Sequence, residues 1–329
     1  MTSPLTKPIS VVFLGSFLEY SASVLQALHN SPLVEVIGVI TTPPKPAGRK
    51  KILKKTDVHL LAEELHLPVF APEKATTKAL QEMATVFKFS VEMPPQIFLT
   101  AGYGKLLPSS WLEFPSIAAL NLHFSLLPAY RGANPAEWAL LRNEKETGVT
   151  VIKMSPSFDT GGVIESAPQP ISATDTRETM YDALYRLGGK ILPQVIADFA
   201  ANKLPIQPQP KESPTPYAKR LNREDGFIDW QAITQAMNGN EIEPSLLAPQ
   251  LKIILEGATP AHITAETIER SIRALAGFPG VWSIISSTKG EKRIKLLSAS
   301  VKDSRLELEM VQIEGQQSAH WNQVKSILK

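Results

Sequence analysis

The sequence has no cysteine among its 329 residues, which excludes disulfides, thiolate metal sites and a cysteine nucleophile. Long hydrophobic runs are also missing. The apolar run Val11–Leu14 is far too short for a signal peptide, and no window reaches the length of a transmembrane helix. The formal net charge is only +2, so no strong overall field draws the chain to nucleic acid or to a membrane. We therefore expect a cytoplasmic protein without a membrane partner.

The composition fits a globular protein, with 43% apolar and 20% charged residues. A chain of this length predicts two domains. The first 200 residues or so alternate between short β-branched runs, such as Ile9–Gly15, and amphipathic stretches, such as Glu19–Asn30. This alternation predicts an α/β, Rossmann-like domain with a parallel-rich sheet and helices on both faces. In such sheets, ligands bind beyond the carboxyl ends of the strands.

The alternating pattern stops near Ala200, where a proline-rich stretch begins. Residues 204–217 (LPIQPQPKESPTPY) lack periodicity, and their composition predicts a stiff, extended linker. Short alternating runs follow it at Val281–Ser286, Arg293–Leu297 and Leu306–Ile313. They predict a small C-terminal β-barrel, for which an OB-like barrel is one candidate. The expected domains are residues 1–203 and 218–329, joined by the linker.

One strand carries an unusual set of polar residues. Side chains alternate across a strand, so Asn121, His123 and Ser125 of the run Ala118–Ser125 point to one side. Buried parallel strands are normally apolar on both faces, so these residues indicate a strand that emerges into a cleft. Further along the chain, Asp159 lies in a polar, glycine-rich loop. A single histidine or aspartate in such places is usually structural, and only the combination indicates catalysis.

These segments resemble the signature of the folate-dependent formyltransferases. The matching residues are Asn121–Pro128, Tyr130–Ala133 with Pro135, and Asp159–Gly161. Other segments resemble the branch of the family that formylates methionyl-tRNA: Pro46–Arg49, Tyr103–Gly104 before Leu107–Pro108, Ile228–Trp230, and Ile268–Ala274 before Phe278–Pro279. The resemblance covers most of the chain.

The resemblance implies transfer of a formyl group from 10-formyltetrahydrofolate to the amino group of initiator methionyl-tRNA, with no metal. Asn121 would donate a hydrogen bond to the oxyanion, and His123 would move the proton or support that charge. Asp159 would orient His123. The folate pocket would include Ser125, Leu126, Leu127 and Pro128. We expect the protein to act as a monomer.

A basic segment at residues 45–55 contains no acidic residue. By itself, such a run usually forms a solvated, mobile loop. In the resembled family, this loop engages the acceptor end of the tRNA, and binding of phosphates by basic side chains weakens steeply with salt. The expected tRNA-binding residues are Arg49, Lys50, Lys51, Lys54 and Lys55. Residues 218–329 are nearly balanced in charge, so tRNA binding there would require folding to gather their basic residues onto one face.

Two alternatives remain open. The chain could formylate a small amine, such as a sugar amine or glycinamide ribonucleotide, or it could be a catalytically silent RNA-binding homologue. A nicotinamide site is excluded, because Gly15 lacks further glycines at the required spacing. Two segments depart from the family pattern. Gly15–Tyr20 replaces a Gly-Thr-Pro motif followed by Phe-Ala, and residues 237–262 resemble an insertion.

Overall fold

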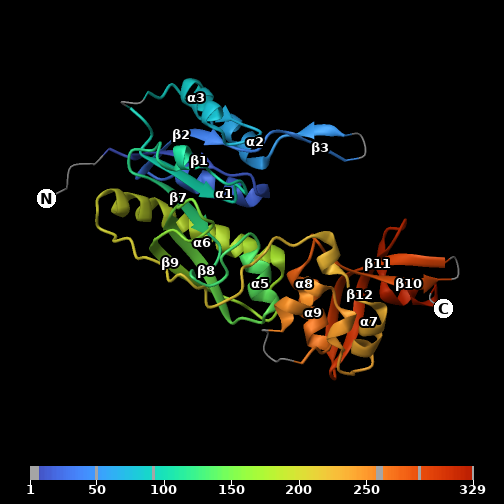
Figure 1. Cartoon of the computed structure of the whole chain (residues 1–329). Coiled ribbons are helices and arrows are strands. Elements are labelled where there is room, and N and C mark those ends of the chain that lie inside the picture. The colour runs from blue at the N-terminus through green and yellow to red at the C-terminus, as the bar shows by residue number, and fades with distance from the viewer. Residues whose placement is uncertain (1–6, 49–50, 91–92, 257–261, 288–289, 328–329) are drawn as a thin grey trace. The chain divides into compact units, whose positions relative to one another are not determined.

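A computed structural model describes residues 7–48, 51–90, 93–256, 262–287 and 290–327 (Figure 1). The chain forms two compact units. The N-terminal unit comprises residues 1–133, 148–169 and 181–217, and the C-terminal unit comprises residues 134–147, 170–180 and 218–329. Two stretches that the sequence placed in the first domain, 134–147 and 170–180, thus cluster by contacts with the C-terminal residues.

A seven-stranded sheet forms the core of the N-terminal unit, in the order β5-β2-β1-β6-β7-β8-β9. Strand β1 pairs parallel with β2 and β6, and β6 pairs parallel with β7. Strand β8 runs antiparallel to β7. The predicted parallel-rich α/β fold is therefore confirmed. The strands are β1 Ile9–Leu14, β2 Val34–Ile40, β5 Val69–Phe70, β6 Ile97–Ala101, β7 Ala118–His123, β8 Glu146–Lys153 and β9 Val163–Pro170.

Helices cover both faces of this sheet, as the alternation of strand-like and helix-like segments along the chain predicted. On one face, Val12 and Leu14 of β1 pack in a buried cluster with Met83 of α3 and Trp111 of α4. On the other face, α6 approaches β7 so closely that a Cβ at Gly188 would lie 2.4 Å from a methyl group of Leu122. The helices of this unit are α1 Leu18–His29, α2 Asp57–Glu64, α3 Thr77–Val86, α4 Ser109–Leu112 and α6 Arg177–Ala200, the last of which begins in the C-terminal unit.

Local sequence signals set where several of these helices begin. Thr56 caps α2 by accepting a hydrogen bond from the His59 amide, and Thr76 caps α3 by accepting one from the Ala79 amide. A threonine in this position satisfies one of the amide groups that a helix start leaves without a partner. Within the described ranges, no helix is long and apolar enough to cross a membrane.

The C-terminal unit contains a four-stranded antiparallel sheet in the order β10-β11-β12-β13. This sheet fits the small barrel-like domain predicted from the short alternating runs. Its strands are β10 Val281–Ser287, β11 Gly290–Lys302, β12 Arg305–Ile313 and β13 Ser318–His320. The helices of the unit are α5 Pro135–Leu141, α7 Trp230–Met237, α8 Pro249–Leu255, α9 Ala265–Ala274 and α10 Trp321–Val324.

Candidate active site

Asn121 lies near the carboxyl end of β7, directly beside Thr100 of the parallel strand β6. The Thr100 hydroxyl donates a hydrogen bond of 2.6 Å to Oδ1 of Asn121. In this orientation of the amide, Oδ1 of Asn121 accepts the hydroxyl hydrogen of Thr100. This orientation leaves the Nδ2 hydrogens, which are donors only, for a different acceptor. Asn121 is only half-buried, so a substrate oxygen can approach it.

His123 and Asp159 come together, although 35 residues of sequence separate them. Nδ1 of His123 lies 3.5 Å from Oδ1 of Asp159, and these side chains are only 5% and 12% exposed. Nε2 of His123 lies 3.0 Å from the Tyr130 carbonyl oxygen. Both ring nitrogens of His123 thus face an oxygen atom that can accept a hydrogen bond. Such contacts often tighten or rearrange when substrate binds.

The loop that carries Asp159 has an unfavourable backbone conformation. Asp159 adopts a φ of +53°, which L-residues rarely adopt. Its Oδ2 accepts a hydrogen bond of 2.9 Å from the Gly132 amide. A Cβ at Gly161 would lie 1.9 Å from the Lys153 carbonyl oxygen, so only glycine lets the loop turn this close to the end of β8. The glycine at the end of the Asp159-Thr160-Gly161 sequence is therefore required for a steric reason.

The proposed folate-pocket residues, Ser125 to Pro128, form a loop after β7 that an internal hydrogen bond stabilises. Ser125 and Leu127 are buried, whereas Leu126 and Pro128 are half-buried. The Ser125 hydroxyl donates a hydrogen bond of 2.6 Å to Ala129 O and so stabilises the loop. The assignment of these four residues to a folate pocket stays a prediction.

Sequence reasoning missed several side chains at this site. Thr100 lies opposite Asn121 on the neighbouring strand β6, and the apolar run around it was the signal that could have located it. Gln209, which contacts the Asp159 loop, gave no catalytic signal, and Arg131 entered only as part of the family signature. Tyr217 was also missed: partial burial raises the pKa of its hydroxyl, and the negative charge of Asp159 adds to this effect. Tyr217 therefore lies within electrostatic range of the Asp159 carboxylate.

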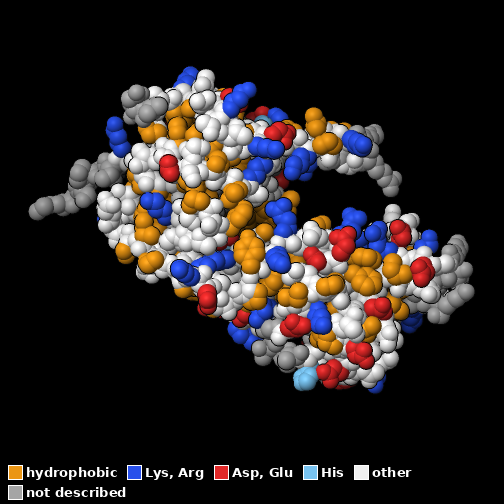
Figure 2. Space-filling view, viewed as in Figure 1, with side chains coloured by type: hydrophobic (Ala, Val, Ile, Leu, Met, Phe, Trp, Pro, Cys, Tyr) orange, Lys and Arg blue, Asp and Glu red, His pale blue; other side chains and the backbone are white. Residues whose placement is uncertain are grey.

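The basic segment, which by itself would usually form a solvated loop, is an antiparallel hairpin of β3 Lys45–Ala47 with β4 Ile52–Lys54. Ile52 and Leu53 are 67% and 66% exposed. Figure 2 shows Lys or Arg and hydrophobic side chains together on this hairpin. Lys55 pairs with Glu63 of α2 at 2.6 Å, so its charge is partly compensated. Of the other expected tRNA-binding residues, Lys51 and Lys54 are described, whereas Arg49 and Lys50 lie outside the described residues.

Folding does not gather all the basic residues of the C-terminal unit onto an exposed face. Arg270 is only 6% exposed, and its Nε donates to Leu141 O, the carbonyl at the end of α5. Burial, together with the nearby charge of Arg273, lowers the Arg270 pKa. Arg273 pairs with Glu269 within α9. These two arginines therefore serve the fold rather than a basic surface.

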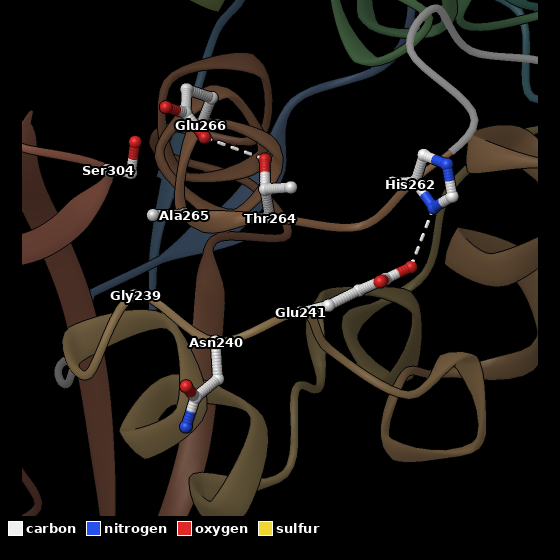
Figure 3. Close-up of a pocket in the computed structure, with 8 residues that line it drawn as sticks. All are labelled: Gly239, Asn240, Glu241, His262, Thr264, Ala265, Glu266 and Ser304. Atoms are coloured by element: carbon white, nitrogen blue, oxygen red, sulfur yellow. Dashed lines mark hydrogen bonds and ion pairs between the residues drawn. The ribbon is translucent and has the colours of Figure 1, made fainter.

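A cavity of about 570 Å³ opens in the same unit, between the end of α7 and the start of α9 (Figure 3). Glu241 and His262 form an exposed pair of 2.7 Å at its edge. The lining residues are Gly239, Asn240, Glu241, His262, Thr264, Ala265, Glu266 and Ser304. In the part of the chain that the structure describes, no three His, Asp or Glu side chains cluster as a metal site would require.

Comparison with known proteins places this geometry in a family. A formyl transferase profile matches residues 9–196, and a profile of the formyl transferase C-terminal domain matches residues 262–323. A methionyl-tRNA formyltransferase of Listeria monocytogenes is 38% identical over 221 residues, 67% of each chain. One of Listeria welshimeri is 34% identical over 298 residues, covering 90% of this chain and 81% of the relative. The chain belongs to the methionyl-tRNA formyltransferase family.

Solved structures share the family fold. A methionyl-tRNA formyltransferase from Clostridium thermocellum aligns with 93% of this chain and 98% of its own, with a TM-score of 0.55 and 14% identity. An N-formyltransferase from Helicobacter canadensis, solved with folinic acid and dTDP-3-aminofucose, has a TM-score of 0.55 and 19% identity. It aligns with 90% of this chain and 88% of its own. These likenesses concern the fold alone.

Proposed function

We propose that the protein transfers the formyl group of 10-formyltetrahydrofolate to the amino group of initiator methionyl-tRNA. Family membership supports formyl transfer, and relatives named for methionyl-tRNA match over most of the chain. The observation that carries the chemistry is the placement of Asn121, His123 and Asp159. An amide whose Oδ1 accepts from Thr100 and a His–Asp pair lie at the end of β7 and in the loop after β8. The proposed domains are a catalytic domain of residues 1–203, a linker of residues 204–217, and a tRNA-binding domain of residues 218–329.

In this reaction, the amino nitrogen attacks the formyl carbon and the carbonyl oxygen becomes an oxyanion. Asn121 donates an Nδ2 hydrogen to that oxygen, because its Oδ1 already accepts from Thr100. One proton leaves the attacking nitrogen and one is delivered to the leaving folate nitrogen, so no proton is gained or lost overall. His123 moves this proton, or supports the oxyanion in its charged form, while Asp159 orients the ring. No step requires a metal.

The β3–β4 hairpin supports a tRNA partner. Its lysines can neutralise phosphates, while Ile52 and Leu53 offer apolar contacts to exposed bases or sugars. These residues contribute binding and not chemistry, because a flexible ammonium group on an exposed hairpin is poorly positioned for proton transfer. We infer that the protein acts in the cytoplasm as a monomer. Sedimentation of the purified protein at micromolar concentration would measure its mass and so test the oligomeric state.

The decisive experiment compares acceptors side by side. The purified protein is incubated with 10-formyltetrahydrofolate and one acceptor: charged initiator tRNA, glycinamide ribonucleotide, or a nucleotide-linked amino sugar. We expect formylmethionyl-tRNA as the main product. Uncharged tRNA is the control, because it lacks the attacking amine.

Two outcomes would contradict the proposal. Faster transfer to a small amine than to charged tRNA would favour a small-amine formyltransferase. No transfer to any acceptor, together with intact function of His123→Ala in cells, would favour a silent RNA-binding homologue.

A further inference from the structure

The proline-rich segment, residues 204–217, is fixed to the N-terminal unit near both of its ends. Gln207 exchanges two backbone hydrogen bonds with Val163 at the start of β9, at 2.7 and 2.8 Å. Near the other end, the Thr215 hydroxyl accepts a hydrogen bond of 2.6 Å from the Tyr130 amide. The Tyr130 carbonyl is the group that faces Nε2 of His123. The segment is thus attached to the loop that contacts the histidine ring.

Gln209 lies between these two attachments and contacts the Asp159 loop directly. Its Nε2 donates to Asp159 O at 2.9 Å and to Gly161 O at 2.7 Å. Its Oε1 accepts a hydrogen bond of 3.0 Å from Nε of Arg131. Both hydrogens of the amide and its oxygen are therefore engaged. The two carbonyls belong to the turn in which Asp159 adopts its positive φ.

Arg131 completes a closed network around the carboxylate. Its terminal nitrogens donate to Pro210 O at 2.7 Å and to Lys211 O at 3.1 Å. Arg131 therefore binds the backbone of the proline-rich segment just after Gln209. The next residue, Gly132, donates its amide to Oδ2 of Asp159. The Asp159 loop is thus held at its backbone by Gln209 and at its carboxylate by the residue after Arg131.

The local sequence prepares this conformation. Gln207 and Gln209 each precede a proline, and a residue in that position is disfavoured from helical backbone and adopts an extended one. The prolines also reduce the conformational freedom that the unfolded segment would lose on ordering. The same prolines that indicated a linker therefore make the segment a stiff support for the Gln209 side chain.

We propose that Gln209 is a positioning residue for formyl transfer, which holds the Asp159 backbone so that its carboxylate faces His123. This inference rests on the proposed function. Gln209 does not touch the reacting atoms, so its loss should lower turnover by misplacing Asp159 and leave substrate binding nearly intact. A displacement of about 1 Å at a catalytic group can lower the rate about 100-fold.

The test replaces Gln209 and compares it with a matched glutamine. Gln209→Ala and Gln209→Glu both remove the two donors, and the second keeps the size of the side chain. Gln207→Ala is the control, because its side chain is exposed and makes no hydrogen bond among the described residues. We expect both Gln209 variants to lower kcat at least 10-fold, with the KM of each substrate changed less than threefold. Gln207→Ala should match the wild type.

A double-mutant cycle separates positioning from a general structural effect. If Gln209 acts through Asp159, then Gln209→Ala should lower kcat less than twofold further in an Asp159→Ala background. Exchange of the Gly132 amide hydrogen should also accelerate in Gln209→Ala and not in Gln207→Ala, since that amide is protected by the Asp159 carboxylate.

Wild-type turnover distinguishes the two ideas. Inactive wild type would overturn the proposed function, and amide exchange would still test whether Gln209 holds the loop. Active wild type with near-normal Gln209→Ala would overturn only the positioning role. Equal loss of kcat in the wild-type and Asp159→Ala backgrounds would overturn it as well, as would unchanged Gly132 exchange.

Discussion

The surroundings of His123 and the β3–β4 hairpin differ in how their side chains are held. The side chains of His123 and Asp159 are only 5% and 12% exposed, and each makes a hydrogen bond to a backbone group. On the hairpin, Ile52 and Leu53 project into solvent, and the Lys55–Glu63 pair is itself exposed. Fixed geometry serves a reaction whose rate depends on small distances. Exposed cations suit the tRNA binding proposed for the hairpin, which would depend mainly on charge. Substitutions in the two regions should therefore change different kinetic parameters, kcat for the surroundings of His123 and KM for the hairpin.

The largest effect is expected at Asn121, the proposed oxyanion donor. Asn121→Ala removes the Nδ2 group, and loss of one such donor typically costs about 3 kcal/mol, a fall in kcat of roughly 100-fold or more. Thr100→Val keeps the amide and removes only the group that orients it. We expect a smaller fall in kcat for this variant. Steady-state kinetics with saturating tRNA and folate measure both. Near-normal kcat in Asn121→Ala would remove this residue from the active site.

The hairpin should change binding while the chemical step is preserved. Lys51→Ala with Lys54→Ala removes up to two phosphate contacts, so the slope of log KM for tRNA against log salt should fall by about 2. We expect kcat and the KM for folate to stay within about twofold of wild type. Lys190→Ala with Lys302→Ala, two exposed lysines elsewhere, is the matched control. An unchanged salt slope would refute the assignment of tRNA binding to the hairpin.

The smallest effect is expected on the stability of the fold, at one buried polar side chain. Tyr103 is buried, and among the described residues its hydroxyl has no hydrogen-bond partner. Removal of the hydroxyl in Tyr103→Phe should therefore stabilise the fold by about 1 kcal/mol. Burial also raises the Tyr103 pKa to about 12 from a usual value of 10.0.

The sign of the pH effect follows from this raised pKa. Below pH 10, both the folded and the unfolded Tyr103 hydroxyl are protonated. As pH rises from about 10 to about 12, only the unfolded form ionises, so the free energy of unfolding falls by about 1.4 kcal/mol per pH unit. Urea melts of wild type and Tyr103→Phe at pH 9 and pH 11 isolate this residue. Parallel losses in both proteins would show that Tyr103 does not cause the effect.

Much of the fold could be predicted because it depends on local patterns. Alternating apolar runs predicted the parallel-rich sheet, and short runs near the C-terminus predicted β10 to β12 within a few residues. The hairpin was not recognised as paired strands, since its first strand contains Pro46, a residue that is rare within strands. Residues 134–147 lie within the proposed catalytic domain, and only the structure shows that contacts such as Arg270 with Leu141 O cluster them with the C-terminal unit.

The sequence by itself determined that Asn121 and His123 share a face at the end of a strand, because side-chain alternation is a local property of β-structure. Only the tertiary structure decided that Asp159 reaches His123, and that the proline-rich segment holds the Asp159 loop through Gln209. These contacts join residues 36 to 50 positions apart in the chain. Hydrogen bonds of that kind depend on how strands and loops assemble in space, and no local periodicity of the sequence encodes them.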